Sequence, residues 1–252
     1  MGTVFSFDVR TFGAQDEERV RAGLTAAVAG LHHVDEVFST YRAESQVSRL
    51  ARGELALEDC DAEVTEVLRH CVAEESLSEG YFTARYAGDA LDPTGVVKGW
   101  AVERAVRMLV SSGAAAVCLN GGGDIQLHGG PWRVGISDPL GPGGLVAVVE
   151  AHRTLAVATS GPAERGCHIV DPYTGKPPEV ALASLTVVCP GLTQADARAT
   201  AAYAMGDRAR DWLEGLPDTE AFAVTADGRI WQTSGFTRHL ATAPIRPDGK
   251  AA

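Results

Sequence analysis

The sequence predicts an α+β fold with mainly antiparallel sheets and packed helices. Its first half contains long stretches in which apolar residues recur at helical spacing, and its second half contains short apolar runs separated by Gly- and Pro-rich turns. Parallel strands need long crossover connections, so runs joined by such short turns favour antiparallel pairing over a doubly wound sheet. With 45% hydrophobic and 22% charged residues, the composition is that of an ordinary globular protein.

The first half begins with an alternating strand and then becomes helical. A polar stretch that opens on F-S-T-Y indicates a loop followed by a short helix, and G-Y-F-T-A-R-Y begins a loop or short strand. Pro93 breaks the chain directly before a helix with apolar residues on one face. We therefore expect a strand at 1–12, helices at 16–38, 61–79 and 95–111, the loop and short helix at 38–50, and the loop or strand at 80–89.

The second half is rich in strands. The expected strands are 115–120, 124–128, 132–137, 145–152, 154–160 and 182–189, with a short strand and turn at 168–177. Helices are expected at 193–206 and near 207–214, before a final hairpin at 221–233 with Asp227-Gly228 at its tip. We expect one domain over 1–240, helix-rich to about 112 and β-rich over 113–240, and a disordered Pro- and Ala-rich tail at 241–252.

Charge and apolar patterning exclude several classes of function. The net charge of −11 argues against nucleic-acid binding, which needs a basic face. The sequence has no apolar run long enough for a membrane span, and it opens as a strand rather than as a leader. We therefore expect a cytoplasmic protein, or an extracytoplasmic one if a leader was trimmed. Five scattered cysteines without a C-x-x-C pair argue against a disulfide framework and against a zinc site.

The run T-Q-A-D-A-R-A-T at 193–200 is the most informative stretch of the chain. Asp196 and Thr200 lie four residues apart at the start of an expected helix, so they share one face. A carboxylate and a hydroxyl on one face form half of a site for a hard cation such as Mg²⁺. Thr193 and Asp196 also match a capping box, in which both side chains only satisfy helix N–H groups. The spacing leaves both interpretations open.

Two further runs bring charge and glycine to the expected ends of elements. In D-P-T-G-V-V-K, Asp92 precedes a helix and Lys98 lies in its first turn, where a lysine opposes the helix dipole unless an anion binds nearby. The alternative is a solvated lysine. In N-G-G-G-D-I at 120–125, backbone amides could approach a ligand closely, or the glycines could simply form a tight hairpin turn.

The run around 158–177 is dense in hydroxyls and glycines and contains His168. A histidine beside an anionic ligand can act as a base or as a cation, whereas a lone histidine can equally be a hydrogen-bonded structural residue. Cys167 and His168 are neighbours on an expected strand and point to opposite faces, which disfavours a nucleophile–base pair. The run T-S-G-P lacks the G-x-S-x-G pattern of a serine hydrolase.

Taken together, these runs resemble the ApbE family of FAD:protein FMN transferases. The resemblance covers about residues 1–235 and rests on six motifs in the family's order. They are M-G-T at the start, F-S-T-Y with a downstream Ser, D-P-T-G-V-V-K-G-W, N-G-G-G-D-I, A-T-S-G with H-I-V-D-P-Y-T-G-K-P, and T-Q-A-D-A-R-A-T.

The resemblance implies a Mg²⁺-dependent enzyme with the flavin in a cleft between two parts. Such an enzyme takes FAD as substrate, cleaves its pyrophosphate, releases AMP and attaches FMN to a Ser or Thr hydroxyl of an acceptor flavoprotein subunit. Some relatives instead hydrolyse FAD to FMN and AMP. We therefore keep a FAD pyrophosphatase and a non-catalytic flavin-binding module as alternatives to the transferase.

The resemblance also implies roles for particular residues. Asp196, the Thr200 hydroxyl and the backbone carbonyl of Gly95 would bind Mg²⁺, and His168 would lie closest to the chemistry. The residues implied to contact the flavin dinucleotide are Met1, Tyr41, Phe82, Thr83, Asp92, Lys98, Gly122, Asp124 and Ile169.

The chain departs from the family at two places. Thr193 stands where relatives often have another acidic ligand, and only about fifteen residues separate Phe82 from Lys98, many fewer than in relatives. The cleft wall formed by that segment is therefore expected to be reduced, which affects acceptor choice more than FAD binding.

Overall fold

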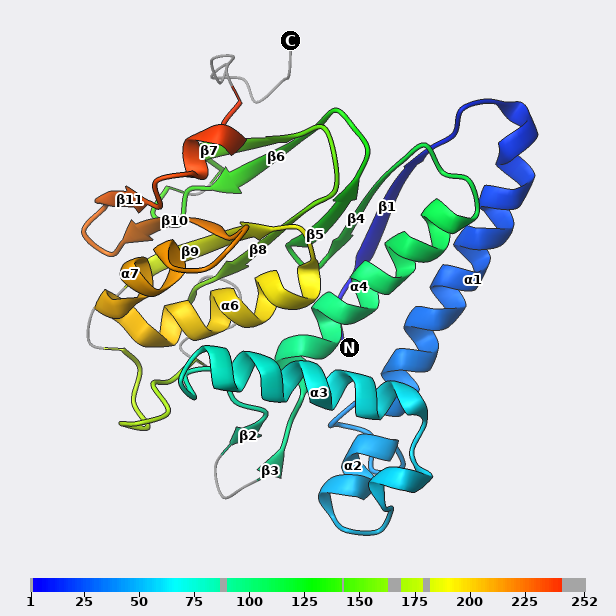
Figure 1. Ribbon diagram of the computed structural model, residues 1–252, viewed down its shortest axis with the longest axis horizontal. Coiled ribbons are helices and arrows are strands. Elements are labelled where there is room, and N and C mark those ends of the chain that lie inside the picture. The colour runs from blue at the N-terminus through cyan, green and yellow to red at the C-terminus, as the bar shows by residue number, and fades with distance from the viewer. Residues whose placement is uncertain (1, 87–89, 142, 163–168, 179–181, 242–252) are drawn as a thin grey trace.

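The computed structural model describes residues 2–86, 90–141, 143–162, 169–178 and 182–241, and these form an α+β fold (Figure 1). Within them, a seven-stranded antiparallel sheet has the order β1-β4-β5-β8-β9-β10-β11. Its strands are β1 (Phe5–Arg10), β4 (Ala116–Gly121), β5 (Asp124–His128), β8 (Leu155–Ser160), β9 (Leu182–Cys189), β10 (Glu220–Thr225) and β11 (Ile230–Gln232). The predicted fold class and antiparallel pairing are confirmed.

Helices pack against one face of this sheet and around its lower edge in the view of Figure 1. They are α1 (Ala14–Phe38), α2 (Gln46–Ala51), α3 (Ala62–Leu77), α4 (Thr94–Ser111), α6 (Leu192–Met205) and α7 (Ala209–Glu214). Short 3₁₀ turns are η1 (Leu57–Asp59), η2 (Gly206–Arg208) and η3 (Phe236–His239). Among the described residues, no helix combines the length and the apolar character needed to cross a membrane.

The second face of the sheet is covered by a separate hairpin, β6 (Trp132–Ser137) with β7 (Leu145–Ala151). The sheet therefore has two buried faces, and its strands divide their side chains between two cores. On β10, Ala221 and Ala223 enter the core with the helices, whereas Phe222 and Val224 enter the core with the hairpin. This period of two explains why the central strand β9 is buried along its whole length and reads as a continuous apolar run.

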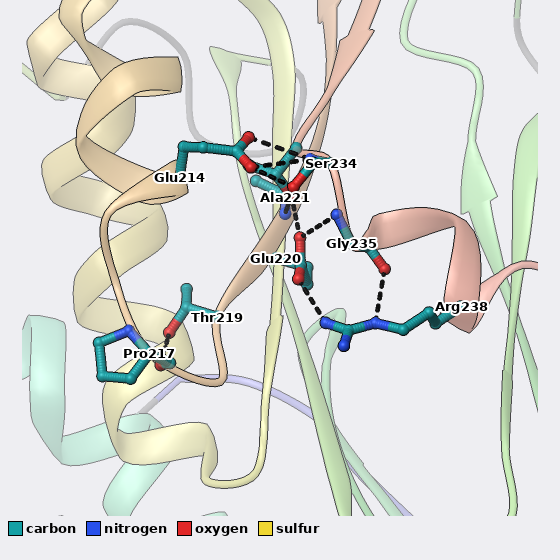
Figure 2. Close-up of polar contacts among 9 residues, drawn as sticks. Glu214, Pro217, Thr219, Glu220, Ala221, Ser234, Gly235 and Arg238 are labelled. Atoms are coloured by element: carbon teal, nitrogen blue, oxygen red, sulfur yellow. Dashed lines mark hydrogen bonds and ion pairs between the residues drawn. The ribbon is translucent and has the colours of Figure 1, made fainter.

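The C-terminal segment is fixed to the end of α7 and the start of β10 by carboxylates. Glu220 accepts hydrogen bonds from the Gly235 amide at 3.1 Å and from the Arg238 guanidinium at 2.6 Å, and Glu214 accepts one from the Ser234 amide at 3.0 Å (Figure 2). The chain then runs beside β7, where the Ala241 amide donates to the carbonyl of Val148 at 2.9 Å. This segment covers the outer edge of β7.

One predicted element needs correction, and another is confirmed. No strand occurs in the described part of 168–177; residues 171–176 form a turn closed by Gly175 N–H donating to the Asp171 carbonyl at 2.8 Å, because Pro172 lacks an N–H and Gly175 adopts φ +66°. The described part of the 80–89 region is a loop followed by the short strand β2 (Arg85–Tyr86), which pairs with β3 (Ala90–Leu91), so the predicted loop or short strand is confirmed. The tail beyond Ala241 lies outside the described residues. The division near 112 stays a prediction, although the sheet includes β1 from the first part.

The helices α4 and α6 cross at Gly99, and this contact matters most for the site described below. A Cβ atom at Gly99 would lie 2.9 Å from the carbonyl carbon of Leu192, closer still to its oxygen, and 3.2 Å from the Cβ of Asp196. Only a glycine lets the two backbones approach so closely without displacement. The absence of a side chain at Gly99 therefore brings the second turn of α4 against the start of α6.

Replacing Gly99 by Ala is expected to destabilise the protein by about 2 kcal/mol, because the added methyl meets backbone atoms that cannot rotate away. Gly30→Ala in α1 is the matched control, since a Cβ there would lie 4.0 Å from the Met108 sulfur. That change should stabilise the protein by up to about 1 kcal/mol through helix propensity. Urea unfolding of both variants checks the prediction. Equal stabilisation of both would show that the crossing is looser than described.

A buried ion pair joins α3 to α6. Both partners are largely buried: Arg198 Nε lies 3.4 Å from Glu74 Oε2, and the guanidinium also donates to the Thr219 hydroxyl at 2.6 Å. Burial raises the pKa of the Glu74 carboxyl above its ordinary value, and the attraction of Arg198 offsets only part of that rise. The folded state therefore binds the Glu74 proton more tightly than the unfolded chain does.

This raised pKa predicts a pH dependence of stability. Above the pKa of an unfolded glutamate, about 4.3, the unfolded chain ionises first. The contribution of Glu74 to stability is therefore fully present below that pH and declines as the pH rises through the folded pKa. We expect the free energy of unfolding of the wild type, minus that of Glu74→Gln, to fall between pH 4 and pH 7. A difference that increases with pH would mean that the attraction of Arg198 outweighs burial.

Candidate functional site

A cavity of about 1600 Å³ lies where the two crossing helices, the loop after α1, the ends of β8 and β9, and the β6–β7 hairpin meet. Eight of the predicted site residues line it: Tyr41, Thr83, Asp92, Gly95, Lys98, Ile169, Asp196 and Thr200. These residues come from segments far apart in the sequence, so the fold brings residues of separate motifs together in one cavity.

Lys98 lies between two carboxylates in the wall of this cavity. Its ammonium forms an ion pair with Asp124 and lies 3.7 Å from Oδ1 of Asp196. All three side chains are largely buried, with 18%, 4% and 11% of their surfaces exposed, so solvent screens these charges weakly. The predicted alternative of a solvated lysine is therefore wrong. The three groups together carry a net charge of −1 when all are ionised.

Asp124 is held by the protein on both of its oxygens. Oδ1 accepts a hydrogen bond from the Thr159 amide at 3.0 Å, while Oδ2 pairs with Lys98. It is not among the residues that line the cavity, and neither is Gly122, although Gly123 is. Gly122 and Gly123 have φ of +62° and +94° and form the tight turn between β4 and β5. In the described structure, the run at 120–125 is therefore a hairpin turn that also positions the counter-ion of Lys98.

The N-termini of α4 and α6 differ in what they offer to a ligand. At the start of α4, Asp92 accepts from the Thr94 amide at 3.0 Å, and Thr94, Gly95 and Lys98 border the cavity. A helix N-terminus that opens into a cavity attracts anions. The first turn of α4 is thus the part of the wall best suited to a phosphate.

The start of α6 is instead closed by side chains of the protein. Gln126 accepts from the Leu192 amide at 2.8 Å, and Glu103 accepts from both the amide and the hydroxyl of Thr193, at 3.1 and 2.6 Å. The N-cap is Gly191, which makes no side-chain cap. The capping-box interpretation of Thr193 and Asp196 is therefore wrong. Asp196 instead borders the cavity together with Thr200.

Phe82 supports the site from beneath. It is buried and does not line the cavity, and a Cβ at Gly95 would lie 2.9 Å from its ring. The Phe82 ring packs against the first turn of α4 and fixes its position, and the ring is not presented to the cavity. Thr83, the next residue, borders the cavity, and its hydroxyl donates to Glu75 at 3.0 Å.

Tyr41 projects from a rigid loop at the cavity rim. The Ser39 carbonyl accepts from the hydroxyls of Ser45 and Ser48, at 2.7 and 3.2 Å, and the Ser45 hydroxyl also caps α2 by accepting from the Ser48 amide. This network fixes both ends of the loop while the Tyr41 side chain stays 99% exposed. An exposed aromatic ring held in this way can stack on a flat ligand without first losing much conformational freedom.

Met1 and His168 lie outside the described residues, so their predicted roles stay predictions. Sequence reasoning missed Arg42, Arg85 and the segment 134–139, all of which line the cavity. Arg42 pairs with Asp35 at 3.3 Å. Arg42 directly follows Tyr41 of the F-S-T-Y motif without belonging to it. Arg85 lies in the run G-Y-F-T-A-R-Y, which indicated only a loop or short strand, and the hairpin segment gave only a strand signal.

The described thiols are unsuited to nucleophilic catalysis. Cys60, Cys71, Cys118 and Cys189 are all free, as predicted, and burial raises the pKa of Cys71 to about 12 and that of Cys189 to about 11. These two thiols stay protonated at neutral pH, and a thiol reacts as its thiolate.

The oxygen donors at the cavity wall fit a hard cation only in part. In the described portion of the chain, no group of three or more His, Cys, Asp or Glu side chains is arranged to hold a metal ion. Asp196 supplies a carboxylate, Thr200 a hydroxyl on the same helix face, and Gly95 a backbone carbonyl in the neighbouring turn. Mg²⁺ commonly uses one or two carboxylates and takes its remaining ligands from water and substrate phosphates. The donor set therefore fits Mg²⁺ bound together with a phosphate ligand.

Comparison with known proteins places these residues in a family. The model of the ApbE family matches residues 1–88 and 85–223. The FAD:protein FMN transferase of Treponema pallidum is 30% identical over 172 residues, which are 60% of this chain and 48% of that protein. The transferase of Escherichia coli K12 is 28% identical over 169 residues, with coverage of 60% and 47%. The chain spans about half the length of the curated relatives it matches.

Solved structures of other proteins have the same fold as this chain. The flavin transferase ApbE from Vibrio cholerae superposes with a TM-score of 0.78 at 22% identity, covering 95% of this chain and 96% of that one. The ApbE protein of Thermotoga maritima gives a TM-score of 0.79 at 20% identity, covering 95% and 100%. These likenesses concern the fold, and the family match spans most of the sequence. The chain belongs to the ApbE family.

Proposed function

We propose that this protein transfers FMN from FAD to a Ser or Thr hydroxyl of an acceptor protein and releases AMP. The observation that carries the proposal is the convergence of Lys98, Asp196 and the α4 N-terminus on one large cavity. The names of the relatives, FAD:protein FMN transferase, supply the reaction class.

The electrostatics of the cavity suit a pyrophosphate that arrives with a divalent cation. Because Asp124 and Asp196 offset the charge of Lys98, these three groups alone do not attract a dianion. The first turn of α4 adds partial positive charge from its N–H groups. In this proposal Asp196, the Thr200 hydroxyl and the Gly95 carbonyl hold Mg²⁺, which supplies neutralisation of the charge on the phosphates.

In the transfer step, the acceptor hydroxyl oxygen forms a bond to the FMN-side phosphorus. The bond from that phosphorus to the bridging oxygen breaks, and the bridging oxygen leaves with AMP. The hydroxyl proton must be removed as the new bond forms, and His168, the neighbour of the lining residue Ile169, is the base proposed from the sequence. The Lys98 ammonium reduces the repulsion between the carboxylates of Asp124 and Asp196, and it orients Asp196 toward the cavity.

The aromatic rim and the α4 turn would bind the two ends of FAD differently. Tyr41 offers a face for stacking on a flat ring, and Ile169, which also lines the cavity, adds an apolar contact. Thr94 and Gly95 lie where backbone amides can meet phosphate oxygens. FAD would thus be oriented by stacking at one end and by its phosphates in the middle.

The test is to incubate the protein with FAD and Mg²⁺, with and without a purified Ser/Thr acceptor domain, and to follow AMP by chromatography and the acceptor by mass. AMP together with an FMN mass increment on the acceptor supports the transferase. AMP with free FMN and an unmodified acceptor would favour the pyrophosphatase, in which water takes the place of the hydroxyl. Bound FAD without AMP in either tube would contradict catalysis and favour a flavin-binding module.

A further inference from the structure

The β6–β7 hairpin has one covered edge and one edge that faces the cavity. On β7, the outer edge is covered by the C-terminal segment, through a bridge between Val149 and Leu240 and the Ala241 amide. On the other side, β6 pairs with β7 alone among the strands that the structure describes. An edge strand of six residues with a row of backbone donors and acceptors is a template for another extended chain.

The register of the hairpin shows which residues present their backbone at that edge. The Val148 carbonyl accepts from Ala241, so the backbone of Val148 points away from β6. Val148 lies directly opposite Gly135. In an antiparallel pair, opposite residues either bond to each other or both face outward, so Gly135 directs its N–H and C=O away from β7. Arg133 lies two residues before Gly135 in the regular part of the pairing and faces the same way, whereas the register shifts between Ile136 and Ser137.

The cavity follows this edge of β6. Residues 134–139 all line it, although their side chains alternate between the two faces of the hairpin. Val134 and Ile136 point into the core against the main sheet, while Gly135 and Ser137 are exposed on the opposite face. A cavity that touches both sets borders the strand's edge rather than one of its faces. Gly135 has no side chain to obstruct a chain that approaches its backbone.

The size of the cavity leaves room for a second substrate. Pockets for a single small ligand usually measure about 300–1000 Å³, and this one measures about 1600 Å³. Lys98, Asp196 and the α4 turn border the same cavity as the β6 edge. A polypeptide bound along β6 therefore enters the space in which FAD would be cleaved.

We propose that the acceptor polypeptide binds as an additional strand on the edge of β6 that no described strand covers, with main-chain hydrogen bonds to Gly135 and its outward-facing neighbours. The inference rests on the proposed function and names how its second substrate is held. Recognition through the backbone fixes the position of the acceptor hydroxyl along the strand and requires an extended acceptor segment.

A peptide experiment tests the main-chain contacts. The wild-type protein is incubated with FAD, Mg²⁺ and a nonapeptide library with a central Thr and randomised flanks, and FMN attachment is measured by mass. Two further libraries carry N-methyl groups, one at positions −1 and +1 from the Thr and the other at −2 and +2. Alternate N–H groups of a strand face opposite edges, so one methylated library should lose about tenfold or more of its labelling and the other should lose much less.

A pair of variants tests the enzyme side. Gly135→Pro removes the outward N–H. Gly135→Ala keeps this N–H and, like proline, adds a Cβ atom next to the flexible Leu145 side chain. The measured quantity is the ratio of peptide labelling to AMP release in the absence of peptide. We expect this ratio to be about tenfold lower for Gly135→Pro than for Gly135→Ala. Thermal melts check that both variants fold, and if the proline variant does not, the methylated libraries carry the test with the wild-type protein.

Several results would overturn the inference. Equal labelling of all three libraries, or equal ratios in the two variants, would show that the β6 edge makes no main-chain bonds to the acceptor. A raised KM for FAD in Gly135→Pro without peptide would assign the edge to FAD instead. AMP release without any labelled peptide, from an enzyme that still labels the folded acceptor domain, would exclude docking of an extended segment while leaving the transferase activity intact. The absence of AMP in every tube would contradict the proposed function itself, and the inference with it.

Discussion

Replacing Asp196 by Asn should lower kcat/KM for Mg²⁺-dependent FAD turnover by about a thousandfold, while the fold survives. The change keeps the shape of the side chain, so the packing of α6 against α4 at Gly99 is preserved. It removes the one carboxylate that both lines the cavity and shares a helix face with Thr200. Loss of a charged ligand that stabilises a phosphoryl-transfer transition state costs several kcal/mol, and about 4 kcal/mol corresponds to a thousandfold.

The matched control is Asp211→Asn in α7, which is exposed and distant from the cavity lining. It removes the same charge from the protein and should leave FAD turnover within about twofold, because surface charges act weakly through solvent. AMP release at a series of Mg²⁺ concentrations measures both variants, and circular dichroism checks their folds. Wild-type activity in Asp196→Asn would show that the metal assignment is wrong.

Replacing Lys98 by Met should reduce the free energy of unfolding by about 3 kcal/mol at neutral pH. The change preserves most of the aliphatic length of the side chain but leaves Asp124, with 4% of its side chain exposed, without its ammonium partner. A buried charge that loses its partner is strongly destabilising, typically by about 3–5 kcal/mol. Asp196 lies on the other side of the same ammonium, so the two carboxylates would also repel each other more strongly.

The double variant Lys98→Met/Asp124→Asn is the control for this interpretation. The Asn side-chain oxygen can still accept from the Thr159 amide, so the hydrogen bond that joins β5 to β8 is kept while the uncompensated charge is removed. Urea unfolding should show that the double variant recovers at least half of the stability lost in the single variant. A double variant that is less stable than Lys98→Met would mean that Asp124 stabilises the fold through contacts other than the ammonium.

Much of the secondary structure could be predicted because it is encoded locally. The helix now seen as α4 (Thr94–Ser111) follows from Pro93 and a 3.6-residue apolar period, and β10 (Glu220–Thr225) follows from alternation and the Asp227-Gly228 turn. The turn at 171–176 was predicted in part as a strand, because an apolar His-Ile-Val run precedes it. There the hydrogen bonds of Asp171 and the fixed φ of Pro172 override the apolar signal.

The candidate site depends more on long-range contacts, and less on local sequence, than the secondary structure does. The motif that contains Asp196 could be recognised in the sequence, but its spacing fits a helix cap as well as a cation site. What separates the two is Glu103, which binds Thr193 from 90 residues away. In the same way, the partner of Lys98 is Asp124, on a strand that the helical spacing around Lys98 does not reveal. Long-range contacts of this kind have no local signature.

The sequence by itself therefore determined the α+β class, the antiparallel pairing of strands joined by short turns, and the family. Local periodicity and short motifs carry this information. Only the tertiary structure decided that the Lys98 ammonium lies between the carboxylates of Asp124 and Asp196. It also decided that Phe82 packs against Gly95 without lining the cavity, and that the β6 edge borders that cavity. The physical reason is that these features depend on the close crossing of α4 and α6 at Gly99 and on which sheet face the hairpin covers. Both are set by the packing of segments that are distant along the chain.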